Sequence, residues 1–394
     1  MQLRPCWVEI STRALEDNYR FLRSLAPRAE LLAIVKADAY GHSLAICAPA
    51  LVRAGAGWLG VTSVEEGAAA RAVCPETRVL VIGGVFAGQG AAVIERKLTP
   101  VVWEHWQLDE LERAARANGA AAQSVALHLE LDTGMSRQGV PLRDGSVALD
   151  EMLARFTADS PLRLEGVMTH LYAADESDGE ATAEQLARLD AALGRIAAAG
   201  HQPEIVNVGN SAALLAGKAD TIANIAARYR AKAMLRPGLA LYGVAPGFAP
   251  EEPAPVASAR ASIQPVLTWK TRVVSVRSVP AGATVGYNGT FVATEPMRLA
   301  LLALGYADGL DRRLGNRFSL LVRGQKAPIV GRISMDQTVL DITEIEGVEP
   351  HDEVVILGAQ GAETISAYDH ADAAGTVPWE IFTRIAARVR RVAV

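Results

Sequence analysis

The stretch AIVKADAYGH, residues 33–42, says most about how this chain folds and what chemistry it carries. An apolar run over residues 31–35 ends abruptly at Lys36, a pattern typical of a buried strand that stops at a polar edge. A lysine at the mouth of a strand can be partly removed from water, which lowers the pKa of its amine and makes it a nucleophile toward an aldehyde. Residues 37–42 then place small side chains, the hydroxyl of Tyr40 and a glycine around that amine.

Around this stretch, short apolar runs rich in Val, Leu and Ile alternate with longer helical segments from about residue 12 to about residue 245. Amphipathic segments such as Glu104–Asn118 and Glu180–Ala199 separate the runs, and Gly200 is a typical helix stop. Eight strand–helix units over ~240 residues predict an α/β fold of the (β/α)8 TIM-barrel type, whereas a doubly wound sheet usually has fewer strands. The eight expected strands are Leu31–Val35, Trp58–Val61, Val79–Ile82, Thr99–Val102, Val125–Leu131, Leu162–Val167, Glu204–Val206 and Ala233–Leu235.

The closely spaced prolines of Val244–Pro265 indicate a boundary or linker. After it, the alternation of strands and helices gives way to strand-like segments with few helical stretches between them. We expect a barrel over residues 12–245 and a mainly β domain formed by residues 1–11 and 246–394. Pro378–Val392 is expected to end the chain as a helix, and no internal repeat is found. The strand-like segments of the second domain are Val266–Val279, Met297–Leu304, Phe318–Val322, Ala327–Ile333, Thr338–Ile342 and Glu353–Leu357.

Composition excludes several classes of function. The chain has 394 residues, of which 50% are hydrophobic and 21% charged, so a large core is expected and disorder is not. A net charge of -5 gives no reason to expect nucleic acid or an anionic membrane as partner. We expect no signal peptide, no membrane span and no metal site, and we interpret Cys6, Cys47 and Cys74 as reduced thiols of a cytoplasmic protein.

Polar side chains follow five of the expected strands. They are Lys36, Arg137, His170, the pair Asn210–Ser211 at the start of a helix, and Arg236. Catalytic residues of (β/α)8 barrels lie just past the carboxyl ends of the strands. Five such residues at one rim therefore predict an active site there, although each alone would be a weak signal.

Residues 33–42 also resemble the pyridoxal-phosphate (PLP) lysine motif of the alanine racemase family. The resemblance implies a barrel followed by a β domain, PLP as cofactor, and reversible interconversion of L- and D-alanine. It also implies a head-to-tail homodimer, in which each active site takes residues from the partner's β domain. The other matching segments are Asp132–Gly139, Thr169–Asp175, Asn210–Ala213, Arg236–Gly243, Val285–Phe291, Gly305–Gly309, Gly331–Gln337 and Gly375–Arg388.

The resemblance implies two catalytic bases, Lys36 and, from the partner chain, Tyr287. Two bases on opposite faces of the substrate Cα explain racemisation, because one removes the proton and the other returns it on the far side. Tyrosine has an ordinary pKa of ~10 and needs assistance to act as a base. The family resemblance places His170 in contact with Tyr287 and Arg236 beyond it.

Arg236 is the residue that best distinguishes a racemase from the alternative functions. In the family its guanidinium meets the pyridine nitrogen of PLP, and because arginine stays protonated it keeps that nitrogen unprotonated. A decarboxylase of the same architecture is expected to place an acidic residue there, so Arg236 argues against that alternative. The long β region containing Tyr287 argues against a non-catalytic PLP-binding protein built from the barrel alone. A barrel scaffold without a cofactor is a further alternative.

The resemblance assigns the remaining site residues by position. Ser211, Tyr40 and the backbone amides of Gly238 and Leu239 would bind the cofactor phosphate, with Trp379 nearby. Arg137 would contact the cofactor's phenolic oxygen and the substrate carboxylate. Met335 and Asp336 would form a pocket wall and its support, and Asp175 and Tyr306 the access corridor.

Two positions depart from the family's pattern. Glu130 stands where the family commonly has a lysine, and we predict that its carboxylate holds Arg137. Trp379 stands where the family usually has a tyrosine; an indole is bulkier and cannot accept a hydrogen bond. The second departure leaves alanine, serine and broader substrate specificity open.

Overall fold

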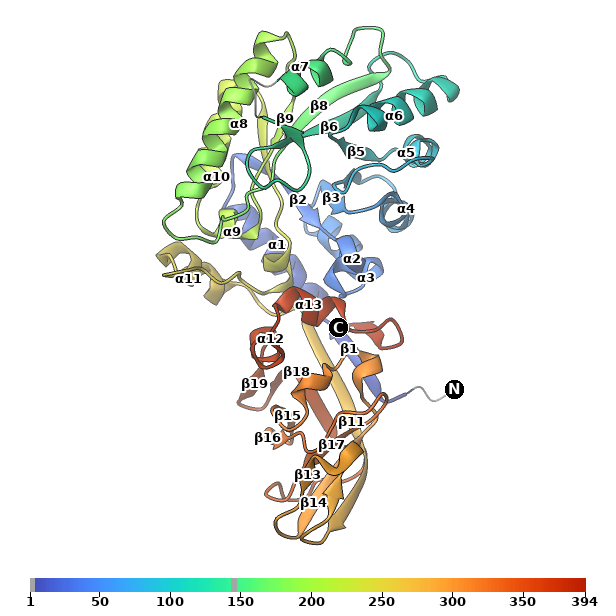
Figure 1. Cartoon of the computed structure of the whole chain (residues 1–394), viewed down its shortest axis with the longest axis vertical. Coiled ribbons are helices and arrows are strands. Elements are labelled where there is room, and N and C mark those ends of the chain that lie inside the picture. Colours follow the sequence, from blue (N-terminus) through green and yellow to red (C-terminus); the bar gives the residue numbers. More distant parts are fainter. Residues whose placement is uncertain (1–3, 143–146) are drawn as a thin grey trace. The chain divides into compact units, whose positions relative to one another are not determined.

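The computed structural model describes residues 4–142 and 147–394. The chain forms two compact units, of which the first comprises Arg13–Ala39 and Cys47–Gln264 (Figure 1). This unit contains a sheet in which eight parallel strands close into a barrel, as predicted. The strands are β2 (Ala29–Ile34), β3 (Trp58–Val61), β4 (Arg78–Val81), β5 (Thr99–Val102), β6 (Val125–Asp132), β8 (Leu162–Met168), β9 (Ile205–Asn207) and β10 (Lys232–Leu235), and the two-residue β7 (Val140–Pro141) pairs with the end of β6.

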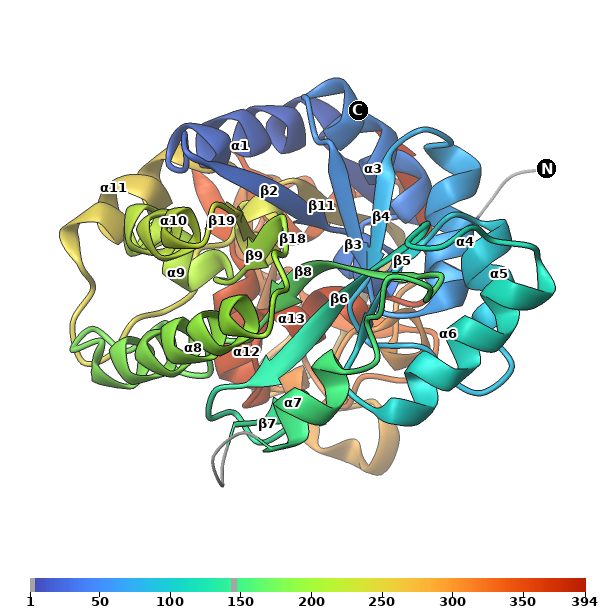
Figure 2. The ribbon, with the colours of Figure 1, turned by 90° about the horizontal axis from the view of Figure 1, so that it is seen from above.

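Helices surround the ring of strands (Figure 2). Strands covered on both faces have no exposed side, which is why β3 and β5 are buried at every position and show no polar alternation, and why β3 is a continuous apolar run. The helices are α1 (Thr12–Ser24), α3 (Leu44–Arg53), α4 (Val64–Val73), α5 (Gly90–Glu95), α6 (His105–Ala117), α7 (Val147–Leu153), α8 (Glu180–Ala198), α9 (Ser211–Leu215), α10 (Ala219–Arg228) and α11 (Ala254–Ser262).

The segment expected as a linker belongs to the barrel unit and contains α11. Pro253 stands at the N-cap of α11, where a proline does not interrupt a helix. The end of the segment is fixed to α1, because the backbone N–H of Gln264 donates to Oδ1 of Asn18 at 2.8 Å. The Nδ2 of Asn18 returns a hydrogen bond to the carbonyl of Gln264 at 2.8 Å.

The second unit is built from the N-terminal strand, Tyr40–Ile46 and Pro265–Val394. Its mostly antiparallel sheet has the order β16-β15-β18-β11-β1-β20, with β14 paired to β11 and to β17. The first and last strands of the chain are parallel neighbours in this sheet. The strands are β1 (Cys6–Ile10), β11 (Leu267–Val279), β14 (Met297–Leu302), β15 (Ser319–Val322), β16 (Gln325–Pro328), β17 (Thr338–Asp341), β18 (Glu353–Gln360), β19 (Glu363–Ile365) and β20 (Arg390–Ala393).

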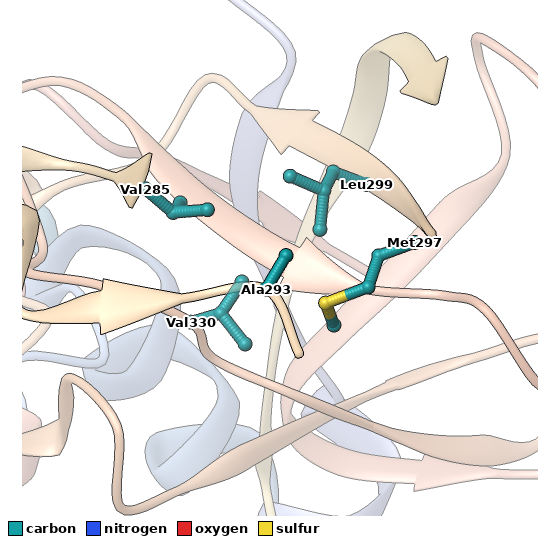
Figure 3. Packing of buried hydrophobic residues seen from close by; sticks show 5 residues of the cluster. All are labelled: Val285, Ala293, Met297, Leu299 and Val330. Carbon is teal, nitrogen blue, oxygen red and sulfur yellow. The ribbon is translucent and has the colours of Figure 1, made fainter. Parts of the chain in front are cut away.

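A small separate hairpin, β12 (Thr284–Val285) with β13 (Phe291–Val292), carries the loop that contains Tyr287. The hairpin is anchored by a hydrophobic cluster in which Val285 packs with residues from three neighbouring segments (Figure 3). The buried members are Val285, Ala293, Met297, Leu299 and Val330. The exposed loop therefore stands on a packed base.

Two predictions for this unit were wrong in detail. The expected helix over Pro378–Val392 ends at Thr383, as α13 (Pro378–Thr383), and the chain then forms β20 against β1. Pairing with a strand at the other end of the chain overrides the local helical pattern. The strand expected over Ala327–Ile333 is β16, which starts earlier and ends at Pro328, before Gly331 turns the chain with a φ of 78°.

Candidate functional site

The segment after β2 carries Lys36 and has an unusual backbone. In α2 (Lys36–Tyr40), the four residues Ala37, Asp38, Ala39 and Tyr40 have φ values of 52°, 53°, 57° and 54°. This left-handed conformation costs about 1–2 kcal/mol for each residue that is not glycine. Such strain persists only where surrounding contacts enforce it, and it gathers at functional sites.

The environment of Lys36 favours its neutral form. Burial is the main cause that lowers the pKa of the amine, and the positive charges of Arg137 and Arg236 lower it further. Glu66, on α4, acts in the opposite direction and raises it. A lysine with a lowered pKa has more of the neutral amine that can attack an aldehyde or accept a proton.

Arg236 is buried and fully engaged with the ends of the neighbouring strands. Its Nη1 donates to the carbonyl of Asn207 at 3.0 Å and to Oδ1 of the same residue at 2.7 Å. Its Nη2 donates to the carbonyl of Thr169 at 2.9 Å and contacts Nδ1 of His170 at 2.9 Å. Burial lowers the pKa of Arg236 to about 10, so the guanidinium remains charged at neutral pH.

His170 is neutral in this arrangement. Burial and the cations Arg236, Arg137 and Lys36 lower its pKa to about 3. The neutral imidazole accepts from Arg236 at Nδ1, which assigns the ring proton to Nε2. His170 thus has one N–H left with which to contact a further group.

Gln185 of α8 supports this histidine and was not foreseen from the sequence. Its side chain is fully buried, and its Nε2 donates to the carbonyl of His170 at 2.9 Å and to Oγ1 of Thr133 at 3.0 Å. Thr133 in turn lies 2.7 Å from Oγ1 of Thr169. A glutamine on the apolar face of an amphipathic helix was the signal available in the sequence.

Glu130 has a different partner from the one predicted. Its Oε2 accepts from Nε2 of Gln138 at 2.5 Å, and it makes no ion pair with any residue that the structure describes, Arg137 included. Burial raises the pKa of Glu130 to about 7, against the lowering effects of Gln138, Arg236 and Arg137. A carboxyl group that is only partly ionised at neutral pH has less need of a cationic partner, and Arg137 is left exposed.

The predicted phosphate-binding residues lie together at the ends of β9 and β10. The backbone N–H of Gly238 donates to Oγ of Ser211 at 2.9 Å, and Leu239 begins the short helix η2 (Leu239–Tyr242) that follows. Asn210 caps α9, since its Oδ1 accepts from the N–H of Ala213 at 3.0 Å. Hydroxyl and backbone amide donors so placed suit an anion such as phosphate.

Tyr40 and Trp379 belong to the second unit, and the segments that carry them are in contact. Gly41, which follows Tyr40, has a φ of 77°, and a Cβ there would lie 2.2 Å from the carbonyl oxygen of Phe382. Phe382 is on α13, the helix of Trp379. Burial raises the pKa of Tyr40 to about 12, so its hydroxyl keeps its proton.

Three of the predicted residues of the β unit expose large side chains. Tyr287 is 68% exposed, Met335 53% and Tyr306 42%. Their loops touch, because the N–H of Tyr306 donates to the carbonyl of Ser334 at 3.0 Å and a Cβ on Gly286 would meet the backbone N of Arg332 at 3.1 Å. Exposed aromatic groups on adjoining loops are typical of a surface that meets another molecule.

Asp336 belongs to an ion-pair network that holds these loops. Its Oδ1 accepts from Nη2 of Arg388 at 2.7 Å, and Nε of the same arginine donates to Oδ1 of Asp308 at 2.8 Å. Asp308 is fully buried, and its Oδ2 also accepts a hydrogen bond from Nη2 of Arg4 at 2.9 Å. Arg388 therefore holds the carboxylate of Asp336, which is next to Met335 in the sequence, and the role of Asp336 as support of a pocket wall stays a prediction.

The structure thus brings the predicted residues together in two groups. Lys36, Arg137, His170 and Arg236 interact electrostatically at the carboxyl ends of the barrel strands, with Glu130 beside them, and Ser211 and Gly238 lie at strand ends of the same rim. Asp175 is exposed in the loop after β8. Tyr287, Tyr306, Met335 and Asp336 form the group of the β unit.

Residues 4–142 and 147–394 contain neither a metal-binding cluster of side chains nor a membrane-spanning helix. No group of His, Cys, Asp and Glu side chains there could hold a metal ion. None of the helices is both long and apolar enough to cross a membrane, within the same part of the chain.

Comparisons with known proteins cover almost the whole chain. The family model for the alanine racemase N-terminal domain matches residues 10–246, and that for the C-terminal domain matches residues 266–393. An alanine racemase of Symbiobacterium thermophilum is 38% identical over 390 residues, which is 99% of this chain and 97% of the relative. An alanine racemase of Syntrophobacter fumaroxidans is 37% identical over 380 residues, covering 96% and 95%.

Solved structures give the same result. The alanine racemase of Streptomyces lavendulae, a producer of D-cycloserine, matches with a TM-score of 0.89 at 34% identity, over 100% of this chain and 98% of that one. The alanine racemase of Bartonella henselae, solved with covalently bound pyridoxal phosphate, matches with a TM-score of 0.82 at 26% identity, over 99% of both chains.

Proposed function

The chain belongs to the alanine racemase family and is a PLP-dependent amino-acid racemase, and we propose that Lys36 and Tyr287 are the two bases with which it interconverts L- and D-alanine. The observation that carries the proposal is Lys36 itself. It is a partly buried amine with a lowered pKa, at the rim of a barrel, beside two arginines. If purified protein supplied with PLP leaves the optical rotation of L-alanine unchanged, the proposed activity is wrong.

The donor groups at the barrel rim fit PLP. The amine of Lys36 would hold the aldehyde, and the charged Arg236 would donate to the pyridine nitrogen. Ser211 with the backbone amides of Gly238 and Leu239, and the protonated hydroxyl of Tyr40, would bind the phosphate. When bound, PLP withdraws electrons from the substrate Cα and so acidifies its proton.

The protein's part in the reaction is to hold the substrate and move one proton. We propose that the guanidinium of Arg137, exposed and without an ion-pair partner among the described residues, binds the substrate carboxylate. Nζ of Lys36, once freed from the aldehyde by the incoming substrate amine, would take or return the Cα proton on one face, and Oη of Tyr287 would do so on the other. The Nε2–H of neutral His170 is available to position the phenol of Tyr287.

We propose that Tyr287 reaches the site from a second copy of the chain, in a head-to-tail homodimer. The proposal is supported by the exposed Tyr287, Tyr306 and Met335 of the β unit, and by Phe86 and Trp106 of the barrel unit, which are 58% and 44% exposed. Large apolar side chains exposed in both units are expected of a surface buried by self-association.

Mixing two inactive variants tests the shared site. In a dimer of Lys36→Ala with Tyr287→Phe, a site shared between chains would combine the intact Lys36 of one chain with the intact Tyr287 of the other. Coexpression should therefore restore about one quarter of wild-type activity, from random pairing in a twofold dimer. No recovery above that of the separate variants would mean that each site is built within one chain.

Substrate range and location complete the proposal. We propose alanine as the substrate, and a panel of L-amino acids assayed for the D-product tests whether Trp379 has changed that preference. We also propose that the protein works in the cytoplasm, where the buried thiols of Cys6, Cys47 and Cys74, none of which forms a disulfide within the described residues, would stay reduced.

A further inference from the structure

We propose that Glu66 is a positioning residue for Lys36, whose carboxylate holds the left-handed turn after the lysine and sets a negative charge beside the amine. The inference rests on the role proposed for Lys36. It concerns a residue that the sequence did not single out, on α4, 30 positions beyond the lysine.

The carboxylate of Glu66 bridges the ends of two neighbouring strands. Its Oε1 accepts from the backbone N–H of Ala37 at 2.7 Å, and its Oε2 accepts from the backbone N–H of Thr62 at 2.7 Å. The β2–β3 ladder continues to the bond between the Val35 N–H and the Gly60 carbonyl, at 2.8 Å. Beyond that bond the two strands separate, and the Glu66 carboxylate supplies the acceptors that a paired strand would otherwise provide.

The position of Glu66 on its helix explains why the carboxylate is available. Ser63 caps α4, with its side chain accepting from the N–H of Glu66, which makes Glu66 the third residue of the helix. A glutamate at that position usually turns back to the N–H of the cap residue itself. Here it reaches past Ser63 to Thr62 and across to Ala37, so the group that would cap the helix holds the lysine turn instead.

The turn needs such a contact. Four consecutive residues other than glycine hold positive φ, a conformation that a chain of L-residues rarely sustains. One internal bond, from the Ala39 N–H to the Val35 carbonyl at 2.8 Å, closes the turn. The bond from the Ala37 N–H to a carboxylate is charge-assisted, which is the stronger class, and it acts on the residue directly after Lys36.

The charge of Glu66 also acts on the amine. Lys36 faces three groups that are positive or can become so, Arg137, Arg236 and His170, and one carboxylate, Glu66. Burial and the arginines lower the pKa of Lys36, whereas Glu66 raises it. Removal of the Glu66 charge should therefore lower the pKa of Lys36 further, while the contact with Ala37 is weakened at the same time.

The two effects can be measured without catalysis. Lys36 in the full-length, cofactor-free chain is titrated by its rate of labelling with trinitrobenzenesulfonate over a range of pH, with the modified peptide quantified by mass spectrometry. Glu66→Gln should shift the labelling midpoint of Lys36 to lower pH by about one unit, because one neighbouring negative charge is lost. It should also weaken equilibrium binding of PLP about tenfold through misplacement of the amine.

Two further variants separate the effects and provide the control. Glu66→Asp keeps the charge but is one methylene too short to reach both N–H groups, so it should leave the midpoint near that of wild type and still weaken PLP binding. Glu65→Gln removes the neighbouring, exposed carboxylate, whose partner is Gln89, and should change neither quantity. Circular dichroism of each variant checks that it is folded.

The outcomes distinguish this inference from the proposed function. An unchanged Lys36 midpoint in Glu66→Gln, or an equal shift in Glu65→Gln, would overturn the positioning role. If Glu66→Gln fails to fold, a Glu66→Asp variant that binds PLP as tightly as wild type overturns the part of the inference that concerns the turn. A wild-type chain that binds no PLP at Lys36 would instead contradict the function, with the titration of the amine still measurable.

Discussion

Nη2 of Arg236 lies 2.9 Å from Nδ1 of His170, at the carboxyl ends of β10 and β8. The pKa values of the two groups are far apart, at about 10 for the arginine and about 3 for the histidine, so a charged donor meets a neutral acceptor. The same guanidinium is tied to Thr169 and Asn207, which leaves it little freedom to turn. The contact fixes both the orientation of the arginine and the tautomer of the histidine.

Replacement of Arg236 by lysine should show how much this geometry contributes. A single ammonium cannot reproduce the planar fork that reaches Thr169, His170 and Asn207 at once. We expect kcat to fall about 100-fold in both directions, since small misplacements of reacting groups have effects of that size. Arg228→Lys, on the surface beside Asp190, is the matched control and should stay close to wild type. A kcat for Arg236→Lys within threefold of wild type would contradict this account.

Tyr287→Phe should separate the two proton transfers. For a racemase the equilibrium constant is one, so kcat/KM must fall equally in both directions, and we expect a loss of roughly 10²–10⁴-fold. The exchange of the substrate Cα proton with deuterated water can, in contrast to kcat/KM, differ between the two enantiomers. One enantiomer, whose proton faces Lys36, should still exchange, while exchange of the other should nearly stop. Nuclear magnetic resonance of the recovered alanine measures both; equal loss from the two enantiomers would argue against two separate bases.

Glu130 should make the stability of the protein depend on pH. Its folded-state pKa is raised from 4.5 to about 7 by burial, so the protonated form is favoured in the folded chain. The stability from this group is complete below pH 4.5 and is lost as the pH rises through 7, by about 3 kcal/mol in all. Glu130→Gln does not ionise, so its free energy of unfolding relative to wild type should increase by about that amount between pH 4.5 and 8.

Urea denaturation of cofactor-free protein at several pH values measures this difference. Glu176→Gln, at an exposed position of the same unit, serves as control and should run parallel to wild type. A Glu130→Gln profile parallel to wild type would mean that the carboxyl of Glu130 ionises in the folded protein as it does in water.

The ion pairs of Asp308 should stabilise the β unit. Asp308 is fully buried between Arg388 and Arg4, and Arg388 also holds Asp336. Arg388→Met removes one partner of a buried carboxylate, which typically costs about 3–5 kcal/mol. The surface pair of Arg323 with Asp352, whose side chains are 49% and 26% exposed, is the matched control, and Arg323→Met should cost less than about 1 kcal/mol. Thermal denaturation compares the two variants, and similar losses would contradict the buried role.

The barrel could be predicted from sequence because its strands are apolar on both faces. An apolar run such as Trp58–Val61 indicates a strand that is buried on both faces. The helical segments between such runs restrict the possible connections between strands to a few topologies. The C-terminal end could not be predicted in the same way. Arg390–Ala393 is extended because it pairs with β1, at the opposite end of the chain, and no local pattern reports such a partner.

The resemblance supplied the candidate site residues one by one, whereas most of the contacts that hold them could not be predicted from the sequence. Nothing in the residue types of Ala37 or Ala39 favours positive φ, and the carboxylate that holds the turn comes from Glu66, in another element. Gln185 acts on His170 from α8, and Glu130 binds Gln138 in place of Arg137. These contacts form between elements that are far apart in the sequence, so no local pattern predicts them. The chemical role of a single residue, by contrast, can be inferred from its type and its place in a motif.

The most direct measurement is to treat the purified holoenzyme with borohydride, digest it and locate the pyridoxyl group by mass spectrometry. The account predicts a single modified peptide that carries the group on Lys36, and none in a Lys36→Ala variant treated in the same way. A reduced sample without a pyridoxyl group, or with the group on another lysine, would contradict the account.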